Sequence, residues 1–362
     1  MASQATVTHG VMEGGGSYNV HARLRARAAD LTLPFLEQAV RDLTVEGGTE
    51  PVVIADCGSS HGKNSLAPMR VAIKELRARV GPERAIFVVH IDQAANDFNT
   101  LFDVLHKDPE RYSRNDPKIY PSAIGRSLYE SVLPGDHVHL GWFSYAAVWL
   151  SRIPMSIPDH FISLASTAEV RAAFHRQAAE DWTSFLSLRA DELRPGGRLV
   201  VVLPGNNDDG GVGFEPLFTH ANEALAEMVR DGTITSDERS RMALGAYPRR
   251  RSALLAPFTD SQFRGLKVEH CELSAVPDTA WVNYERDGNK EVLVNRHVGF
   301  FRAIFVPSLA SALPHEKNPA FTDGLEKRLK QRLSERPTPL HSFVQTMVLA
   351  KQDSTPIHRE TR

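Results

Sequence analysis

Two acidic residues, Asp56 and Asp92, each follow a short apolar run in this chain. The runs, at 52–55 and 85–91, are typical of buried parallel strands. Open α/β sheets bind ligands at the carboxyl ends of such strands, and a carboxylate after the second strand commonly accepts hydrogen bonds from ribose hydroxyls. An Asp after a strand often only caps a turn, but two acids in equivalent positions favour a ligand-binding edge.

The turn after the first run has the sequence CGSSHGKN at 57–64. Glycines let a backbone approach a ligand closely, yet the turn fits neither the GxxxxGK[ST] phosphate loop nor the full GxGxxG dinucleotide fingerprint. An acid beside a glycine turn, with no basic residue matched to phosphate, suits a ligand that carries a ribose and an ammonium group. S-adenosylmethionine has both, so we expect it as the cofactor.

A third segment, 141–151, is dense in aromatic residues and follows a predicted strand at 136–140. Aromatic clusters are more often core than pocket, but this one lies just past the carboxyl end of a strand, so both interpretations stay open. Tyr145 and Trp149 are four residues apart and would share one face if the segment were helical.

The histidines and serines of the chain do not form a recognisable metal-binding or hydrolase motif. The histidines do not have the spacing of metal ligands, and there is no GxSxG nucleophile elbow. We therefore expect no metal. The histidines considered are His9, His61, His139 and His297.

Composition narrows the class of protein further. The 362 residues include 42 Lys plus Arg and 44 Asp plus Glu, a formal charge of −2, which gives no strong field toward nucleic acid or an anionic membrane. The one conspicuous basic cluster, 249–251, is expected to be a solvated patch. Cys57 and Cys271 are too few for a disulfide framework and fit a reducing compartment. With no apolar run near 18 residues and no signal-peptide core in the first 15, we expect a soluble cytoplasmic protein.

Strand and helix patterns alternate along the chain, which predicts an α/β fold with a mostly parallel sheet. A helical pattern at 18–43 contains Pro34, which should kink or split it, and residues 1–16 are expected to be mobile without ligand. We expect a cofactor-binding core with an N-terminal lid at 1–205, helical cap insertions at 206–260 and 285–330, and the remaining core strands at 261–284 and 338–352. Further strands are expected at 198–203, 266–273 and 341–351, and further helices at 67–79, 98–105, 168–193, 216–231, 236–244 and 292–313.

Five segments in order resemble the SABATH methyltransferases, the group that includes the salicylate, benzoate and theobromine enzymes. The segments are MEGGGSY at 12–18, ADCGSSHGKN at 55–64, DQAANDFN at 92–99, SYAAVWLSRIP at 144–154, and the long helix before the Pro-Gly-Gly turn at 195–197. The resemblance implies a class I, Rossmann-like methyltransferase fold with a helical cap over the active site, and we expect a bacterial member that forms a homodimer.

The family pattern also implies roles for individual positions. Tyr145 and Trp149 would face the methyl acceptor. S-adenosylmethionine would be held by Ser17, Tyr18, Asp56, Gly58, Ser59, Asn64, Asp92, Gln93, Ser122 and Ala123.

Arg25 is the position at which the chain departs from that pattern. The family holds the substrate carboxylate with a Gln on its first helix, and counting from Ser17 and Tyr18 places Arg25 there. Arg can grip a carboxylate through two charge-assisted hydrogen bonds, which Gln cannot do. The alternative is that Arg25 faces solvent and another group holds the carboxylate.

These observations predict methyl transfer from S-adenosylmethionine to a carboxylate of a small hydrophobic acid, aromatic or a medium-chain fatty acid. A carboxylic acid is already ionised near neutral pH, so in-line displacement needs alignment and no general base. Two alternatives stay open: methylation of a ring nitrogen or a phenolic oxygen, and a methyltransferase-fold protein that binds the cofactor without catalysis.

Overall fold

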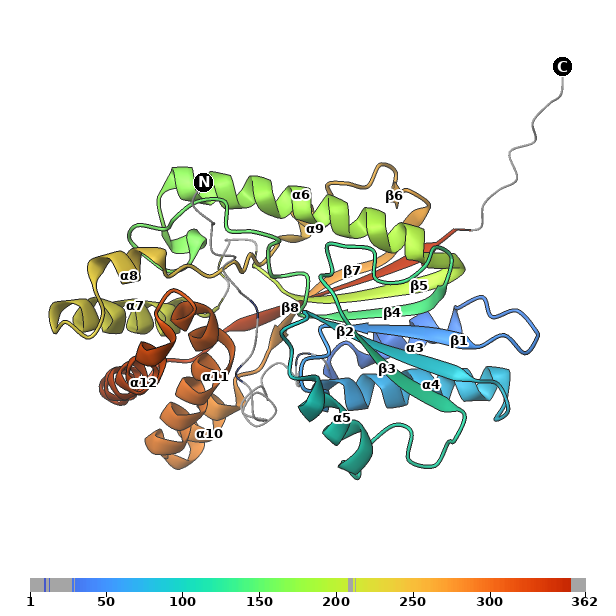
Figure 1. Ribbon diagram of the computed structural model, residues 1–362, viewed down its shortest axis with the longest axis horizontal. Coiled ribbons are helices and arrows are strands. Elements are labelled where there is room, and N and C mark those ends of the chain that lie inside the picture. The colour runs from blue at the N-terminus through green and yellow to red at the C-terminus, as the bar shows by residue number, and fades with distance from the viewer. Residues whose placement is uncertain are drawn as a thin grey trace, which may run out of the picture.

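A single eight-stranded sheet forms the centre of the computed structural model, which describes residues 10, 13, 28, 30–207, 211 and 213–352 (Figure 1). The strands follow the order β3-β2-β1-β4-β5-β8-β7-β6. Their bounds are β1 Val52–Cys57, β2 Ile86–Asp92, β3 Ile119–Gly125, β4 Val138–Ser144, β5 Leu193–Pro204, β6 Gln262–Phe263, β7 Leu266–Val276 and β8 Ser342–Lys351.

The first five strands of the sheet order are parallel, and β8 is antiparallel to both of its neighbours, β5 and β7. The prediction of a mostly parallel α/β sheet is therefore confirmed, and all six expected strands are present. Two strands were not expected, the edge strand β3 and the two-residue β6, because neither has an apolar run that stands out from its surroundings.

Helices cover both faces of the sheet (Figure 1). Alternate side chains of β1 face opposite layers: Val52 and Ile54 pack with α3, α4 and α5, whereas Val53 and Ala55 pack with α6. This alternation makes the sheet buried on both sides, as in doubly wound folds. The helix bounds are α3 Leu33–Arg41, α4 Leu66–Val80, α5 Phe98–Lys107 and α6 Ala168–Glu192.

Local sequence explains where several of these helices begin. Pro34 lies in the first turn of α3, where its missing N–H costs nothing and its fixed φ suits a helix start. The expected helix at 18–43 is thus interrupted before Pro34, as a proline there should do, although residues 14–27 lie outside the described residues. Thr167 caps α6 by accepting a hydrogen bond from the Val170 N–H.

The cap is a group of helices beyond the carboxyl ends of the parallel strands (Figure 1). Three of its helices were not expected, α9, α10 and α12, and because of the last two the second insertion, expected at 285–330, begins before residue 285 and ends after 330. The four large apolar residues of α12, spaced four positions apart, are all buried: Phe321, Leu325, Leu329 and Leu333. The bounds are α7 Glu215–Arg230, α8 Ser236–Arg241, α9 Arg251–Leu255, α10 Thr279–Asp287, α11 Lys290–Ala310 and α12 Asn318–Glu335. No helix within the described ranges is long and apolar enough to cross a membrane.

Two expectations about strand ends are wrong. β4 continues to Ser144 instead of ending at 140, so Trp142 and Phe143 belong to the strand and are buried in the layers on its two faces. The Pro-Gly-Gly sequence at 195–197 lies inside β5 and not before it. Val138 of β4 pairs with Leu193 while Leu140 pairs with Arg198, so the extra residues form a bulge in the sheet.

A buried ion pair at the end of α6 holds the connection between β3 and β4. The Arg189 guanidinium donates to Glu192 Oε1 at 2.8 Å and to the carbonyl oxygens of Leu128 and Glu130, each at 2.9 Å. Glu192 Oε1 also accepts the Val132 N–H at 2.7 Å. This connection has no helix of its own, so the pair supplies the partners that its backbone would otherwise lack.

We expect Arg189→Met to lower the free energy of unfolding by about 3–5 kcal/mol, because it leaves the buried Glu192 carboxylate without its cation. Asp103→Asn is the control, since it breaks the exposed Asp103–Lys107 pair and should change stability by less than about 1 kcal/mol. Urea denaturation of both variants measures the difference. If Arg189→Met is as stable as the parent protein, packing and not the ion pair holds the connection.

Candidate functional site

The turns after β1 and β2 are joined at the carboxyl edge of the sheet. The Gly58 N–H donates to the Ile91 carbonyl oxygen at 2.9 Å, and the Ser60 N–H donates to Asp92 Oδ2 at 2.8 Å. Asn96 closes the contact by donating from Nδ2 to the Ser60 carbonyl oxygen at 2.9 Å. The sequence segments 55–64 and 92–99 therefore form one continuous surface.

Gly58 brings this surface against the end of β4. Its φ is +81°, and a Cβ built on it would lie 2.8 Å from both the Ser144 carbonyl oxygen and the Ala146 Cβ. Only glycine accommodates both the left-handed backbone and the contact. The β1 turn thereby lies beside the segment that begins at Tyr145.

Asp92 is held as an acceptor at the centre of the edge. Its two carboxylate oxygens each accept a backbone N–H at 2.8 Å, from Ser60 and from Gln93. Burial nevertheless raises the pKa of Asp92 to about 6, because the two backbone hydrogen bonds only partly offset the loss of solvation. Each oxygen can accept one further hydrogen bond, as from a ribose hydroxyl.

Asp56 is placed differently from Asp92. β1 runs through Cys57, so Asp56 lies inside the strand and not after it, and its side chain is 2% exposed. Asp56 Oδ2 lies 2.7 Å from His90 Nδ1, and His90 Nε2 lies 2.7 Å from the Tyr112 hydroxyl. Burial raises the pKa of Tyr112, so its hydroxyl stays protonated and forms a neutral hydrogen bond with Nε2, while the Asp56 oxygen is the acceptor at Nδ1. His90 then donates from Nδ1 to Asp56, which fixes the orientation of the carboxylate.

His90 and Tyr112 were missed in the sequence. The available signal was a histidine within the apolar run at 86–91, and the structure places it directly opposite Asp56 in the register of β1 and β2. Such a residue in a buried strand needs polar partners on both ring nitrogens. Tyr112, in a connecting segment, carried no comparable signal.

The β1 turn offers further polar atoms to a ligand. The hydroxyl oxygens of Ser59 and Ser60 are buried and, among the described residues, have no hydrogen-bond partner. Asn64 is partly exposed in the short turn Lys63–Ser65, which follows Gly62 at φ +84°. Buried hydroxyls without partners are costly, so these residues fit a polar cofactor that would complete their hydrogen bonds.

The other predicted cofactor residues have different positions relative to Asp92. Ser122 and Ala123 lie within β3, opposite Val89 and His90, so they are two to three positions before the level of Asp92. Gln93 follows Asp92 directly. Ser17, Tyr18 and Arg25 lie outside the described residues.

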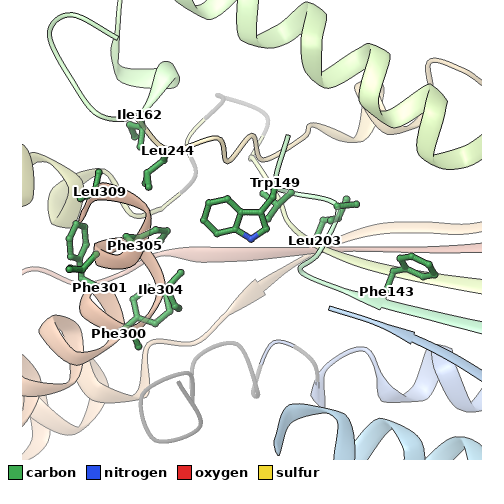
Figure 2. Packing of buried hydrophobic residues seen from close by; sticks show 14 of the residues in the cluster. Phe143, Trp149, Ile162, Leu203, Leu244, Phe300, Phe301, Ile304, Phe305 and Leu309 are labelled. Atoms are coloured by element: carbon green, nitrogen blue, oxygen red, sulfur yellow. The ribbon is translucent and has the colours of Figure 1, made fainter. Parts of the chain in front are cut away.

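A pocket of about 770 Å³, measured with its open mouth, lies between the strand ends and the cap. Figure 2 shows the Trp149 indole between Leu203 of β5 and Phe305 of α11. Tyr145 and Trp149 both line this pocket, and the role of each toward an acceptor stays a proposal. The other residues that line it are Val148, Ile162, Leu164, Pro204, Phe214, Phe218, Leu244, Ala246, Pro248, Phe300, Phe305, Ser342 and Phe343.

The segment from Tyr145 to Trp149 is an irregular turn and not a helix, so the expected helical face is absent. Tyr145 has φ +59°, which is rare for a bulky side chain, and its N–H donates to the Val202 carbonyl oxygen at 2.8 Å. Trp149 forms an isolated bridge with Ala246. Both side chains reach one pocket because the turn reverses the chain, not because four residues make a helical turn.

Buried polar groups hold this turn from behind. The Tyr129 hydroxyl donates to the Trp149 carbonyl oxygen at 2.5 Å, and the Arg249 guanidinium donates to the carbonyl oxygens of Ala147 and Ala178. Arg249 is 2% exposed, so the expectation of a solvated patch at 249–251 is wrong for its first residue. Asp181 of α6 accepts the Ser151 N–H at 2.8 Å and the Ser151 hydroxyl at 2.6 Å.

Gly10 and Glu13, described within a segment expected to be mobile, contact α11. The Gly10 N–H donates to the Ser308 hydroxyl at 3.2 Å, and the Glu13 N–H donates to the Ala303 carbonyl oxygen at 3.1 Å. A Cβ on Gly10 would lie 2.9 Å from the Trp149 ring. Gly10 thus lies against Trp149 of the pocket wall.

The fold is that of a class I methyltransferase. A model of the family described as SAM dependent carboxyl methyltransferase matches residues 4–352. The chain therefore belongs to that family, whose cofactor is S-adenosylmethionine, and the resemblance to the SABATH group is confirmed.

Individual relatives agree with this assignment. Methyltransferase LUC1 from a Fusarium species is 32% identical over 240 residues, which cover 65% of this chain and 62% of that protein, so the chain spans less than two thirds of this relative. Salicylate carboxymethyltransferase from Clarkia breweri is 28% identical over 295 residues, covering 77% and 79% of the two chains. The solved structure of loganic acid methyltransferase with SAH has the same fold, with a TM-score of 0.76 at 21% identity, and the match covers 95% and 99% of the two chains.

The raised pKa of Asp92 leads to a pH-dependent affinity for the cofactor product. Below about pH 6 the carboxyl is protonated in the free protein and offers ribose hydroxyls a poorer acceptor. We expect the affinity for S-adenosylhomocysteine to be constant above about pH 7 and to fall as pH decreases through 6. Calorimetry between pH 5 and 8 measures it.

Asp92→Asn should weaken binding at pH 8 by roughly 1–3 kcal/mol and remove the pH dependence. A pH dependence that persists in Asp92→Asn would assign the titration to another group.

Proposed function

We propose that this protein transfers a methyl group from S-adenosylmethionine to the carboxylate of a hydrophobic acid. The observation that supports this proposal most directly is the composition of the acceptor pocket. Its described lining is apolar apart from Tyr145, Trp149 and Ser342. Such a wall suits an acceptor that arrives already ionised, because a carboxylate needs no residue to take its proton at neutral pH.

The relative position of the two sites supports the same reaction. When bound, S-adenosylmethionine supplies an electrophilic sulfonium methyl group. The residues of this chain orient it: Asp92 and the β1 turn would hold the nucleoside end, and Gly58 places that turn beside Ala146 and the pocket wall. Alignment of this kind supplies on the order of 7–11 kcal/mol in well-oriented reactions.

Trp149 and Arg25 are the residues that we propose to hold the carboxylate. The indole N–H of Trp149 is a donor in a largely apolar wall, and burial of the wall makes such a bond stronger than in water. Arg25 would supply the positive charge that the described lining residues lack. Tyr145, between Trp149 and the β1 turn, would pack against the acceptor.

The activity is tested by incubating the protein with labelled S-adenosylmethionine and a panel of acceptors. The panel contains aromatic acids, medium-chain fatty acids, phenols and xanthines, and the products are identified as methyl esters, ethers or N-methyl compounds. Methyl esters are expected. Products formed only from phenols or xanthines would replace the proposal with the alternative of N- or phenolic O-methylation, and cofactor binding without any product would favour a non-catalytic role.

Trp149→Phe tests the indole donor while keeping most of the packing. We expect kcat/KM for acids to fall by the equivalent of about 1.5–3 kcal/mol, the scale of a hydrogen bond to a charged group, with an unchanged affinity for S-adenosylhomocysteine. Trp182→Phe is the matched control: Trp182 donates to the Leu254 carbonyl oxygen in the core and does not line the pocket. Equal losses for cofactor and acceptor would mark Trp149 as a core residue only.

Arg25→Ala tests the proposed ionic grip. We expect kcat/KM for carboxylic acids to fall by about 1.5–3 kcal/mol of transition-state stabilisation. Arg25→Gln, which restores the amide of the family pattern, should recover part of the loss. Wild-type rates with acids in Arg25→Ala would show that another group holds the carboxylate.

The cellular setting also remains a proposal. Cys57 and Cys271 are both free, which supports the expected cytoplasmic location. We also propose the expected homodimer, which rests on the family resemblance.

A further inference from the structure

Ser342 is a polar residue in the acceptor pocket that neither the cofactor nor the carboxylate requires. It is the first residue of β8, it lines the pocket, and it is 5% exposed. Within the part of the chain that the structure describes, its hydroxyl oxygen is buried and has no hydrogen-bond partner. The residues around it in the wall, such as Phe343 and Pro204, are apolar.

Such a hydroxyl is costly unless something completes its hydrogen bonds. A buried hydroxyl that lacks a partner has lost its hydrogen bonds to water without replacement. Rotation about χ1 of a serine between staggered positions lets the oxygen reach a neighbouring ligand atom. An apolar wall with one unsatisfied hydroxyl is the arrangement by which pockets recognise a single polar group on a hydrophobic ligand.

The position of Ser342 fixes which part of an acceptor it could contact. β8 is separated from β4 by β5 alone, so their ends are roughly 10 Å apart at the usual spacing of strands. Tyr145 and Trp149 follow β4, on the side of the β1 turn. The strand order therefore places Ser342 two strands away from the end of β4, and we place the reacting carboxylate on the β4 side, at Trp149.

We propose that the acceptor is an extended hydrophobic acid that carries a hydroxyl or carbonyl oxygen remote from its carboxylate, and that Ser342 binds this oxygen. The proposal rests on the proposed carboxyl methylation and deepens it. An acid of the size of benzoate spans less than two strand spacings, so with its carboxylate on the β4 side it would not reach Ser342, and a hydroxyl adjacent to the carboxylate would lie at the wrong end. Aromatic walls from α7 and α11, including Phe218, Phe300 and Phe305, would enclose the apolar body between the two polar ends.

The test compares biphenyl-4-carboxylic acid with 4′-hydroxybiphenyl-4-carboxylic acid, which differ by one hydroxyl at the far end. We expect the wild-type protein to prefer the hydroxylated acid in kcat/KM. Ser342→Ala should lower kcat/KM for the hydroxylated acid roughly 5- to 100-fold, as for a hydrogen bond whose partner is left buried. The same variant should leave the parent acid unchanged within about twofold.

Ser163→Ala is the matched control. Ser163 is fully buried, its hydroxyl also lacks a partner among the described residues, and it lies between the pocket residues Ile162 and Leu164 without lining the pocket itself. The ratio of the two acids should stay at its wild-type value in this variant. Equal effects of Ser342→Ala on both acids, or the same change of ratio in Ser163→Ala, would overturn the proposal.

Failure of the proposal and failure of carboxyl methylation are distinguishable. If benzoate is methylated and neither biphenyl acid is, the activity stands and the extended acceptor is wrong. If no acid is methylated, calorimetric binding of the two acids to the protein loaded with S-adenosylhomocysteine decides the matter. Tighter binding of the hydroxylated acid that is lost in Ser342→Ala supports the subsite, and equal or absent binding of both acids overturns it.

Discussion

The contact between the β1 turn and the end of β4, at Gly58, is the constraint on which the rest of the site depends. No side chain fits there, because a Cβ would lie 2.8 Å from Ser144 and Ala146 and the backbone is left-handed. The contact places the turn that carries Ser59 beside the segment that starts at Tyr145. The proposed cofactor site on one side and the proposed acceptor site on the other are adjacent because of this contact. In-line methyl transfer requires that adjacency to within a fraction of an ångström.

Both sides of the contact are irregular backbone, and buried polar groups make them rigid. Asp56, His90 and Tyr112 form one chain of hydrogen bonds behind the β1 turn. Tyr129 and Arg249 hold the carbonyl oxygens of the turn after β4. In a low-dielectric interior a satisfied network is strong and specific, whereas loss of one member leaves a buried group unpaired. The loops that bind ligands are therefore fixed by the scaffold and not by the ligands.

The core and the cap contribute different things to the site. The core, through β1, β2 and β4, supplies the polar edge proposed for the cofactor. The cap, through Phe300 and Phe305 of α11 and Phe218 of α7, supplies an aromatic wall. The fungal relative aligns over only 62% of its length, so the acceptor is proposed from the residues of the wall and not from that relative. Ser342 is distinctive there because its buried hydroxyl has no partner among the described residues.

The sequence by itself determined the parallel core, the edge marked by Asp92, and the family, because buried strands, glycine turns and ordered motifs are local patterns. Amphipathic spacing could also have located α12, whose buried residues are four apart. Only the tertiary structure decided that Tyr145 and Trp149 share a pocket without a helix, that Arg249 is buried beneath them, that His90 orients Asp56, and that Ser342 completes the wall. Each of these depends on which distant segments meet. Strand register and chain reversal determine those long-range contacts, and neither is encoded in the spacing of neighbouring residues.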